Sequence, residues 1–457
     1  MYPVIVTILF LFLSFSKIRK VRSVNSLITG VLLLVFFLGI IEKFNIRLFY
    51  VNILIESLVM FLLVKTMISV SNKRKKFNLP GIRIFAIFSI VLFISALINS
   101  SNLYQSYLYY RFFLTPYLFM LIMVNIELPE YGIRKIIDFI QYLFVFQLIA
   151  TVVKLIVIGT PEQPVGTIIV AGGGVATFIP LIAAGFLLSR YYIYEKKKLF
   201  LVLIFAFTLI AYASQKRGTF VFLPAVFVFF IVMLGEVDIR SRAFHKKVIY
   251  LVSTFVLSII ILIIGAKKIP MMNPEGSKNG SFDLNFLIES SVEYNTLQGD
   301  YAYGRFASFV QVNNILEKSS FVTKLFGFGP ETLKGATRGD GRFERFGVGG
   351  TYPGISYQVV QIGYLGAGLW LLLLCYYGLM IFKILKKEQE RYWKSIGMGS
   401  LVLIFLAIVD YLTYSTTFIV VYAFSFTIAC SFGLMMKRYY RMNTQSKLEV
   451  TSKIRQF

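Results

Sequence analysis

The sequence is poor in the residues that build metal and disulfide sites. Its 457 residues include one histidine and two cysteines, and both cysteines, Cys375 and Cys430, fall inside apolar runs. Such an arrangement matches neither a disulfide framework nor a zinc site. The histidine, His245, lies in a basic segment, where we expect it to be solvated. We therefore expect no metal site and no cofactor.

Charge is scarce as well. Charged residues make up 15% of the chain and hydrophobic residues 57%, with a mean hydropathy of +0.74, which argues against ordinary soluble domains. The unbroken apolar runs favour helices that cross the membrane over the short alternating strands of a barrel. We predict an all-α polytopic membrane protein with about 12–13 transmembrane helices, in the spans 2–16, 24–41, 48–66, 84–99, 107–124, 136–158, 167–189, 199–214, 219–235, 249–265, 355–382, 395–414 and 418–436.

Acidic residues are few beside basic ones, 22 against 47, and the net charge of +25 could suggest a nucleic-acid partner. The position of the charge argues otherwise. Thirty of the 47 basic residues lie in one alternate set of connections, at 17–22, 71–83, 125–135, 190–198, 236–247, 383–394 and 437–457. This pattern places that set and the C-terminus in the cytoplasm and the N-terminus outside. Anionic membrane lipid, and no nucleic acid, is the expected partner of the basic rim.

One connection between spans is long. Residues 1–265 hold the first ten spans, 266–354 form a large outer loop, 355–436 hold the last three spans, and 437–457 form a basic cytoplasmic tail. Within the loop, 273–283 has the composition of a linker, whereas the spacing of Phe306, Phe309 and Val310 predicts a short amphipathic helix against the membrane surface. A loop of this length is usually functional or disordered.

Several charged residues fall in or beside the apolar spans, where each costs free energy unless it meets water or a partner. Lys65 and Lys154 lie near span ends and can extend their ammonium groups to the interface. Glu56 and Asp410 could be paired structural charges. Arg111 stays charged in any environment, so we expect it either to bind a phosphate or carboxylate of the substrate or to form an interhelical salt bridge.

The junction between two spans at "ASQKRGTF" carries Lys216 and Arg217 just before Gly218. There the next helix begins, with free amide groups and the positive end of its dipole. We expect an anion in the outer leaflet to bind here, with an interhelical salt bridge as the alternative reading of Arg217.

The glycine-rich stretch from Phe326 to Gly354 places arginines among tight turns. Glycines allow close approach of the backbone to a ligand, and guanidinium groups bind phosphate or sugar oxygens. The alternative is a solvated flexible loop. The candidate substrate-binding residues of this stretch are Gly327, Gly329, Arg338, Arg342 and Arg345.

Four motifs in order resemble the O-antigen polymerase and O-antigen ligase superfamily. They are "ASQKRGTF" between two spans, "YGRFASFVQVNNIL" in the outer loop, "LFGFGPETL", and "YQVVQIGYLGAGLWLLLL" entering the next span. The resemblance covers mainly residues 211–374, and one late, large outer loop also fits it.

The resemblance implies a GT-C-like membrane glycosyltransferase that moves a glycan from a polyprenyl diphosphate carrier to a hydroxyl of another saccharide, without a nucleotide sugar or a metal. On that reading Arg217 and Arg305 match family arginines and hold the diphosphate, whose growing charge they stabilise. Ligases of the superfamily carry a histidine in the outer loop, and this chain has none there. The polymerase branch is therefore favoured.

A general base, if one is needed, would come from the outer carboxylates Asp300, Glu331, Asp340 and Glu344. The expected partners are a polyprenyl-diphosphate-linked oligosaccharide, a flippase and a chain-length regulator in a bacterial plasma membrane. Two alternatives stay open: a ligase-type glycan transferase, and a flippase for lipid-linked oligosaccharides. The large outer loop speaks against the flippase.

Overall fold

A computed structural model describes residues 21–158, 166–170, 173–213, 217–238, 305–330 and 353–454, together with the single positions 249, 252, 253, 256 and 260. Within these residues the chain folds into helices and contains no strand. Among the described residues, six helices are long and apolar enough to cross a membrane: Leu48–Asn72, Leu103–Asn125, Glu130–Val157, Gly173–Tyr194, Gly354–Lys387 and Arg391–Tyr414. Shorter apolar helices accompany them. The prediction of an all-α, multi-pass membrane protein is confirmed at this level.

The helices follow the apolar runs of the sequence. In chain order they are α2 (Val21–Phe36), α3 (Leu38–Lys43), α4 (Leu48–Asn72), α5 (Ile82–Ile98), α6 (Leu103–Asn125), α7 (Glu130–Ile158), α8 (Gly173–Ser189), η1 (Arg190–Tyr194), α9 (Lys198–Ala213), α10 (Arg217–Asp238), α14 (Arg305–Glu317), α15 (Phe321–Phe326), α16 (Gly354–Lys387), α17 (Arg391–Val409), η3 (Asp410–Tyr414), α18 (Thr417–Val420) and α19 (Tyr422–Ile454). The expected span 2–16 lies outside the described residues. Only five positions of the expected span 249–265 are described.

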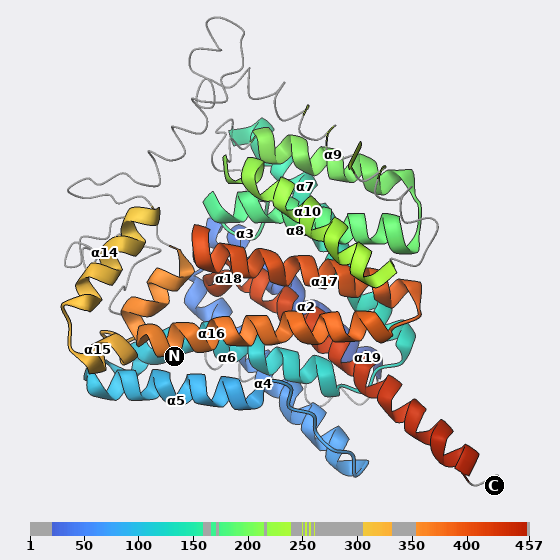
Figure 1. Ribbon diagram of the computed structural model, residues 1–457, viewed down its shortest axis with the longest axis horizontal. Helices are drawn as coiled ribbons and strands as arrows, with labels where there is room; N and C mark the ends of the chain where they lie inside the picture. The colour runs from blue at the N-terminus through green and yellow to red at the C-terminus, as the bar shows by residue number, and fades with distance from the viewer. Residues whose placement is uncertain are drawn as a thin grey trace, which may run out of the picture.

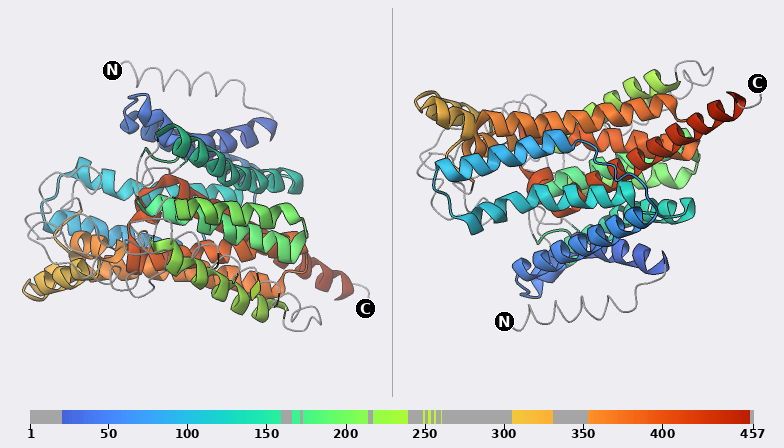
Figure 2. Two further views of the ribbon diagram at one scale, coloured as in Figure 1. Left: turned by 90° about the horizontal axis from the view of Figure 1, so that it is seen from above. Right: turned by 90° about the horizontal axis from the view of Figure 1, so that it is seen from below.

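The long helices lie alongside one another and leave two distinct ends (Figure 1). α14 and α15 lie at one end, and the C-terminal part of α19 projects from the other (Figure 2). α6 packs against α19, α8 against α17, and α16 against both α5 and α17. Large buried side chains fill the space between them, among them Phe113, Phe119, Phe178, Phe227, Trp393 and Phe424.

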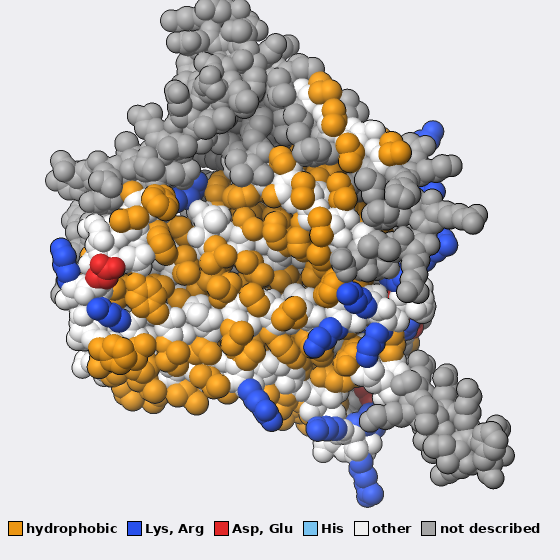
Figure 3. Space-filling view, viewed as in Figure 1, with side chains coloured by type: hydrophobic (Ala, Val, Ile, Leu, Met, Phe, Trp, Pro, Cys, Tyr) orange, Lys and Arg blue, Asp and Glu red, His pale blue; other side chains and the backbone are white. Residues whose placement is uncertain are grey.

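Ion pairs hold together the end from which α19 projects. Both Lys73 and Lys75 contact Glu127, Arg190 Nη2 lies 2.6 Å from Asp138 Oδ1, and Arg134 contacts Glu390. On the face in Figure 3, most basic side chains lie toward this end, beyond a broad hydrophobic band. The described connections 71–83, 125–135, 190–198 and 383–394, which the sequence assigns to one side of a membrane, therefore lie at one end of the bundle.

Glu388, which follows α16, is the buried anchor of this end. Its carboxylate accepts hydrogen bonds from Arg438 Nε at 2.7 Å and Nη2 at 3.0 Å. Burial raises the pKa of Glu388, but the hydrogen bonds from Arg438 and from the backbone amides of Glu390 and Gln389 outweigh it, so the pKa is lowered overall. The loop between α16 and α17 is thereby tied to α19.

At the opposite end the outer-loop helices dock on the kink of α16. The kink lies at Ile362 and Gly363, whose backbone angles are not helical, so carbonyl groups become free to pair. The amide of Phe328 donates to the carbonyl of Val360 at 2.8 Å, and the amide of Gly329 to that of Gln361 at 3.1 Å. These bonds fix α15, and with it α14, against the bundle.

The helix predicted around Phe306 exists as α14, but its packed face differs from the predicted stripe. Ala307, Ser308, Val312 and Leu316 are buried against the protein, whereas Phe306 is 61% exposed and Val310 36% exposed. The small residues Ala307 and Ser308 on the packed side let α14 lie close to the rest of the protein. Contact of the exposed aromatic side with the membrane stays a prediction.

Candidate functional site

The segment Asp410–Phe418 is the meeting point of several helix starts. A Cβ added at Gly354, the first residue of α16, would lie 2.8 Å from the ring of Tyr411 and 3.1 Å from the carbonyl oxygen of Ser415. A Cβ on Gly218, the second residue of α10, would lie 2.8 Å from the ring of Tyr414, and one on Gly174 in α8 would overlap the Thr417 hydroxyl. The N-terminal ends of α8, α10 and α16 therefore face this segment.

Arg305, the first residue of α14, lies over the same tyrosine. Its guanidinium carbon is 3.8 Å from the centre of the Tyr414 ring, which is a close cation–π contact. The Tyr414 hydroxyl lies 3.1 Å from Thr177 Oγ1 on α8, so the ring is held from both sides. A Cβ on Gly218 would lie 2.8 Å from this ring, and Gly218 follows Arg217 directly, so the backbone of Arg217 lies near the ring that the Arg305 guanidinium contacts.

Asp410 supplies a carboxylate beside the arginine. It is 1% exposed; Oδ1 accepts from Ser415 Oγ at 2.6 Å and Oδ2 from the amide of Phe418 at 3.0 Å. Ser415 Oγ also bonds to Thr417 Oγ1. Because Ser415 is only partly buried, its hydroxyl links the buried carboxylate to the edge of the cluster. Arg305 lies close enough to interact electrostatically with Asp410.

Buried polar atoms in the first turns of α10 and α16 lack partners. Thr219 Oγ1, Ser356 Oγ and Gln358 Nε2 belong to side chains that are at most 1% exposed, and none has a hydrogen-bond partner within the described ranges. Buried polar atoms are normally hydrogen-bonded, so these three are sites where a ligand atom could pair. They lie on the helices whose N-termini face Asp410–Phe418.

The arrangement combines two chemical capacities. Helix N-termini and a guanidinium group favour an anion, because free amides and dipoles add to the arginine charge. A carboxylate linked to a serine hydroxyl can accept a proton. A site with both suits the transfer of a group from a phosphate ester to a hydroxyl.

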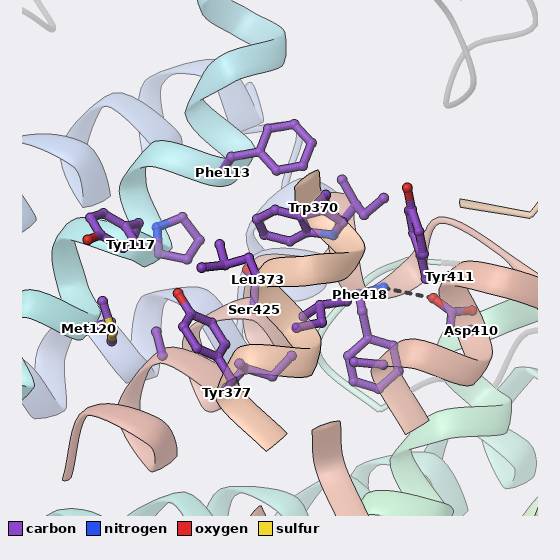
Figure 4. A pocket seen from close by; sticks show the side chains of 16 residues that line it. Phe113, Tyr117, Met120, Trp370, Leu373, Tyr377, Asp410, Tyr411, Phe418 and Ser425 are labelled. Carbon is purple, nitrogen blue, oxygen red and sulfur yellow. Dashed lines mark hydrogen bonds between the residues drawn. The ribbon is translucent and has the colours of Figure 1, made fainter. Parts of the chain in front are cut away.

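An apolar pocket adjoins this cluster on its buried side. Its lining comes from α6, α16, α17, η3, α18 and α19 and is mostly aromatic and aliphatic, including Phe113, Trp370, Tyr377 and Phe418. Asp410 contributes the one carboxylate of the lining and stands at its edge in Figure 4, opposite Met120. The charged cluster thus has a hydrophobic wall on its buried side.

The structure separates the predicted site residues into three groups. Arg305 and the backbone of Arg217 meet at Tyr414, while the Arg217 side chain is not described. Arg111 pairs with Glu56 on α4, with Nη1 3.7 Å from Oε1, so the interhelical salt bridge is confirmed. The remaining charged candidates lie outside the described residues: Lys216, Asp300, Glu331, Arg338, Asp340, Arg342, Glu344 and Arg345.

Gly327 and Gly329 have packing roles in the structure. Their φ angles are +73° and +101°, in the region that favours glycine. A Cβ on Gly327 would lie 2.6 Å from the backbone of Gln361, and the carbonyl of Gly327 accepts from Asn99 Nδ2 at 3.2 Å. The glycine-rich sequence predicts that the backbone here approaches another group closely. In the structure that group is α16 and the end of α5. Contact with substrate stays a prediction for both.

Sequence reasoning did not assign a role to Tyr414, Ser415 or Thr219. Asp410 was visible as an ionisable residue in an apolar run, which is a functional signal in membrane helices. The hydrogen-bond partners of Asp410 are the Ser415 hydroxyl and the Phe418 amide, and the sequence around Asp410 does not identify them.

No family model matches the sequence, and a search of curated proteins finds no match.

Proposed function

We propose that this protein is a membrane glycosyltransferase that polymerises polyprenyl-diphosphate-linked oligosaccharide repeat units into a surface polysaccharide, such as O-antigen, capsule or exopolysaccharide. The observation that carries the proposal is the meeting of Arg305 and the start of α10 at Tyr414, beside Asp410. These are the positions at which the resemblance places the two diphosphate-binding arginines.

The proposed reaction requires charge stabilisation more than redox or hydride chemistry. The acceptor hydroxyl attacks the anomeric carbon, the bond from that carbon to the diphosphate oxygen breaks, and the diphosphate leaves with the electron pair. Arg217, Arg305 and the N-termini of α10 and α16 stabilise the negative charge on the leaving group. The hydrophobic wall beside Asp410 suits the lipid-soluble carrier.

Among the carboxylates that the structure describes, Asp410 is the one beside Arg305, and we assign it the proton of the acceptor hydroxyl. The proton would pass through Ser415, whose hydroxyl donates to Asp410 Oδ1 and reaches the less buried edge of the cluster. Asp300, Glu331, Asp340 and Glu344 remain candidates for the same step.

The proposed orientation follows from the distribution of charge. The basic end with Glu388 and Arg438 faces the cytoplasm, and the end with α14, α15 and Asp410 faces outward, in a bacterial plasma membrane. Lipid-linked units are polymerised after they have crossed the membrane in this proposal, so a flippase would act before the protein and a chain-length regulator beside it.

The test is the length distribution of surface polysaccharide from cells that lack the gene. Wild type, Arg217→Ala and Arg305→Ala are compared in complementation, with the membrane level of each variant measured. We expect single repeat units from the deletion and from both variants, and long polymer from wild type. Phe306→Ala is the matched control, because this neighbouring side chain is 61% exposed.

Other outcomes identify another function. Long polymer that accumulates on the carrier while its lipid acceptor stays undecorated would indicate a ligase. Lipid-linked units that accumulate on the inner leaflet would indicate a flippase. Normal polymer from the deletion strain would contradict the proposal outright.

A further inference from the structure

A second polar cluster lies on α4, α6 and the start of α19. Its centre is Glu56, whose Oε2 accepts from the Tyr107 hydroxyl at 2.6 Å and whose Oε1 lies 3.4 Å from the Tyr422 hydroxyl. Arg111 Nη1 lies 3.7 Å from the same Oε1. The four residues Glu56, Tyr107, Arg111 and Tyr422 are called the Glu56 cluster below.

The Glu56 cluster belongs to the same end of the bundle as Asp410. Glu56 is eight residues into α4, and Arg111 is eight residues into α6. At 1.5 Å per residue, both lie about 12 Å from the helix starts. Tyr422 begins α19 and follows α18 after a single residue, so the segment that includes Asp410 leads directly to this cluster.

The hydrogen bonding of Arg111 is incomplete. The residue is 9% exposed, yet its Nε and Nη1 atoms have no hydrogen-bond partner in the part of the chain that the structure describes. At the opposite end Arg190 also has an unpaired Nε among the described residues, but its Nη2 donates to Asp138 Oδ1 at 2.6 Å, whereas Arg111 comes no closer than 3.7 Å to Glu56. Asn52 Oδ1 and Ser106 Oγ, on neighbouring turns of α4 and α6, are likewise buried and lack a partner among the described residues. An ion pair kept only for stability would be expected to satisfy its donors, since unpaired buried ones are costly.

Glu56 and Arg111 are mostly buried, and exposed tyrosines form the outer edge of the cluster. Tyr107 is 45% exposed and Tyr104 55% exposed, and both lie on the face of α6 that carries Arg111, four and seven residues further along. Tyrosine rings offer flat apolar faces next to polar atoms. Glu56 and Arg111 together have no net charge, which disfavours an anion. They offer an acceptor and donors, which suits the hydroxyl groups of a neutral saccharide.

We propose that the Glu56 cluster binds the acceptor saccharide. The inference rests on the proposed function: a reaction that joins two lipid-linked saccharides must hold both, and the Arg305 site accounts only for the donor diphosphate. Glu56 accepts from acceptor hydroxyls, the open donors of Arg111 bind acceptor oxygens, and the exposed tyrosines pack against the sugar ring.

Photocrosslinking tests the site without relying on turnover. Tyr104→p-benzoylphenylalanine places the reactive group beside the cluster without removing one of its hydrogen bonds, and Tyr142→p-benzoylphenylalanine is the control on α7, where the side chain is 68% exposed. Membranes that contain lipid-linked repeat units are irradiated, and the protein is probed for attached saccharide. We expect at least tenfold more saccharide at position 104 than at 142, and a tenfold loss when Glu56→Gln is added.

Two further variants separate the proposal from its alternatives. The charge swap Glu56→Arg with Arg111→Glu keeps an ion pair, as does Asp138→Arg with Arg190→Glu at the other end. We expect the first swap to lose crosslinking and polymer and the second to keep both. Equal crosslinking at 104 and 142, or wild-type polymer from the first swap, would overturn the proposal.

Failure of the proposed function has a different signature. Arg305→Ala is expected to abolish polymer but to retain the saccharide crosslink at Tyr104, because the acceptor site does not depend on the donor arginine. Crosslinking at position 104 in a protein whose deletion leaves polymer length unchanged would remove the polymerase proposal while leaving the saccharide site in place.

Discussion

Substitution of Gly218 by alanine tests whether α10, Tyr414 and Arg305 act as one unit. The added methyl group would lie 2.8 Å from Tyr414 Cε2 and 3.1 Å from its Cζ and hydroxyl oxygen, closer than side chains tolerate. The ring would have to move. That movement would weaken its hydrogen bond to Thr177 and its contact with Arg305.

The expected magnitude follows from these two contacts. A cation–π contact contributes about 0.5–2 kcal/mol, depending on solvent exposure. If this contact holds Arg305 in place in the transition state, its loss raises the activation free energy by the same amount. Turnover then decreases by about 2-fold to 30-fold, since roughly 1.36 kcal/mol corresponds to a factor of ten in rate. The effect on unfolding is smaller, because alanine is favoured over glycine inside a helix by about 0.5–1 kcal/mol.

The assay is polymerisation of lipid-linked repeat units by purified protein in liposomes, with thermal unfolding recorded for each variant. Gly368→Ala in α16 is the control, because a Cβ there would meet no atom within 4 Å. Turnover of Gly218→Ala equal to that of Gly368→Ala, with both proteins folded, would refute the coupling of α10 to Arg305 through Tyr414.

Two more predictions concern the carboxylates. Asp410→Asn keeps the shape of the side chain but removes the proton acceptor, so we expect turnover to fall by about 100-fold or more with little change in unfolding temperature, whereas Ser415→Ala should give a smaller loss; unchanged turnover in Asp410→Asn would exclude it as the base. The lowered pKa of Glu388 means that its contribution to stability is complete above its unfolded-state pKa of about 4.3 and is lost as the pH falls through the folded-state value. The unfolding temperature of wild type should therefore fall more steeply below about pH 5 than that of Glu388→Gln, as differential scanning fluorimetry would record; parallel curves would show that the bonds from Arg438 do not stabilise the fold.

The helices could be predicted because long apolar runs leave few alternatives in a membrane. The break between the predicted spans 395–414 and 418–436 was expected too, but the departure from the α-helix at Asp410 and the second restart at Tyr422 were not. The stretch after Arg391 is almost continuously apolar, yet the chain leaves the α-helix at Asp410 and starts again twice, at Thr417 and Tyr422. The cause is a set of side-chain hydrogen bonds from Ser415 and the Phe418 amide to Asp410, which hydropathy does not detect.

Part of the candidate site could also be predicted from the sequence. Arg305 and Arg217 could be singled out by their motifs, but nothing in their spacing identifies Tyr414 as the ring that both positions approach, since it lies more than one hundred residues away. Arg111 was recognisable as a costly charge. Its partner, Glu56, belongs to another helix, and pairing between helices depends on rotations that the local sequence does not determine.

The most direct test of the central claim is turnover by the isolated protein. Purified wild-type protein in liposomes is supplied with radiolabelled, polyprenyl-diphosphate-linked repeat units from the deletion strain, and products are separated by length. We predict a ladder of polymer from wild type, released polyprenyl diphosphate in proportion to the linkages formed, and neither from Arg305→Ala. Wild-type protein that is folded and yet leaves the repeat units unjoined, or an Arg305→Ala variant that makes the same ladder, would contradict the account.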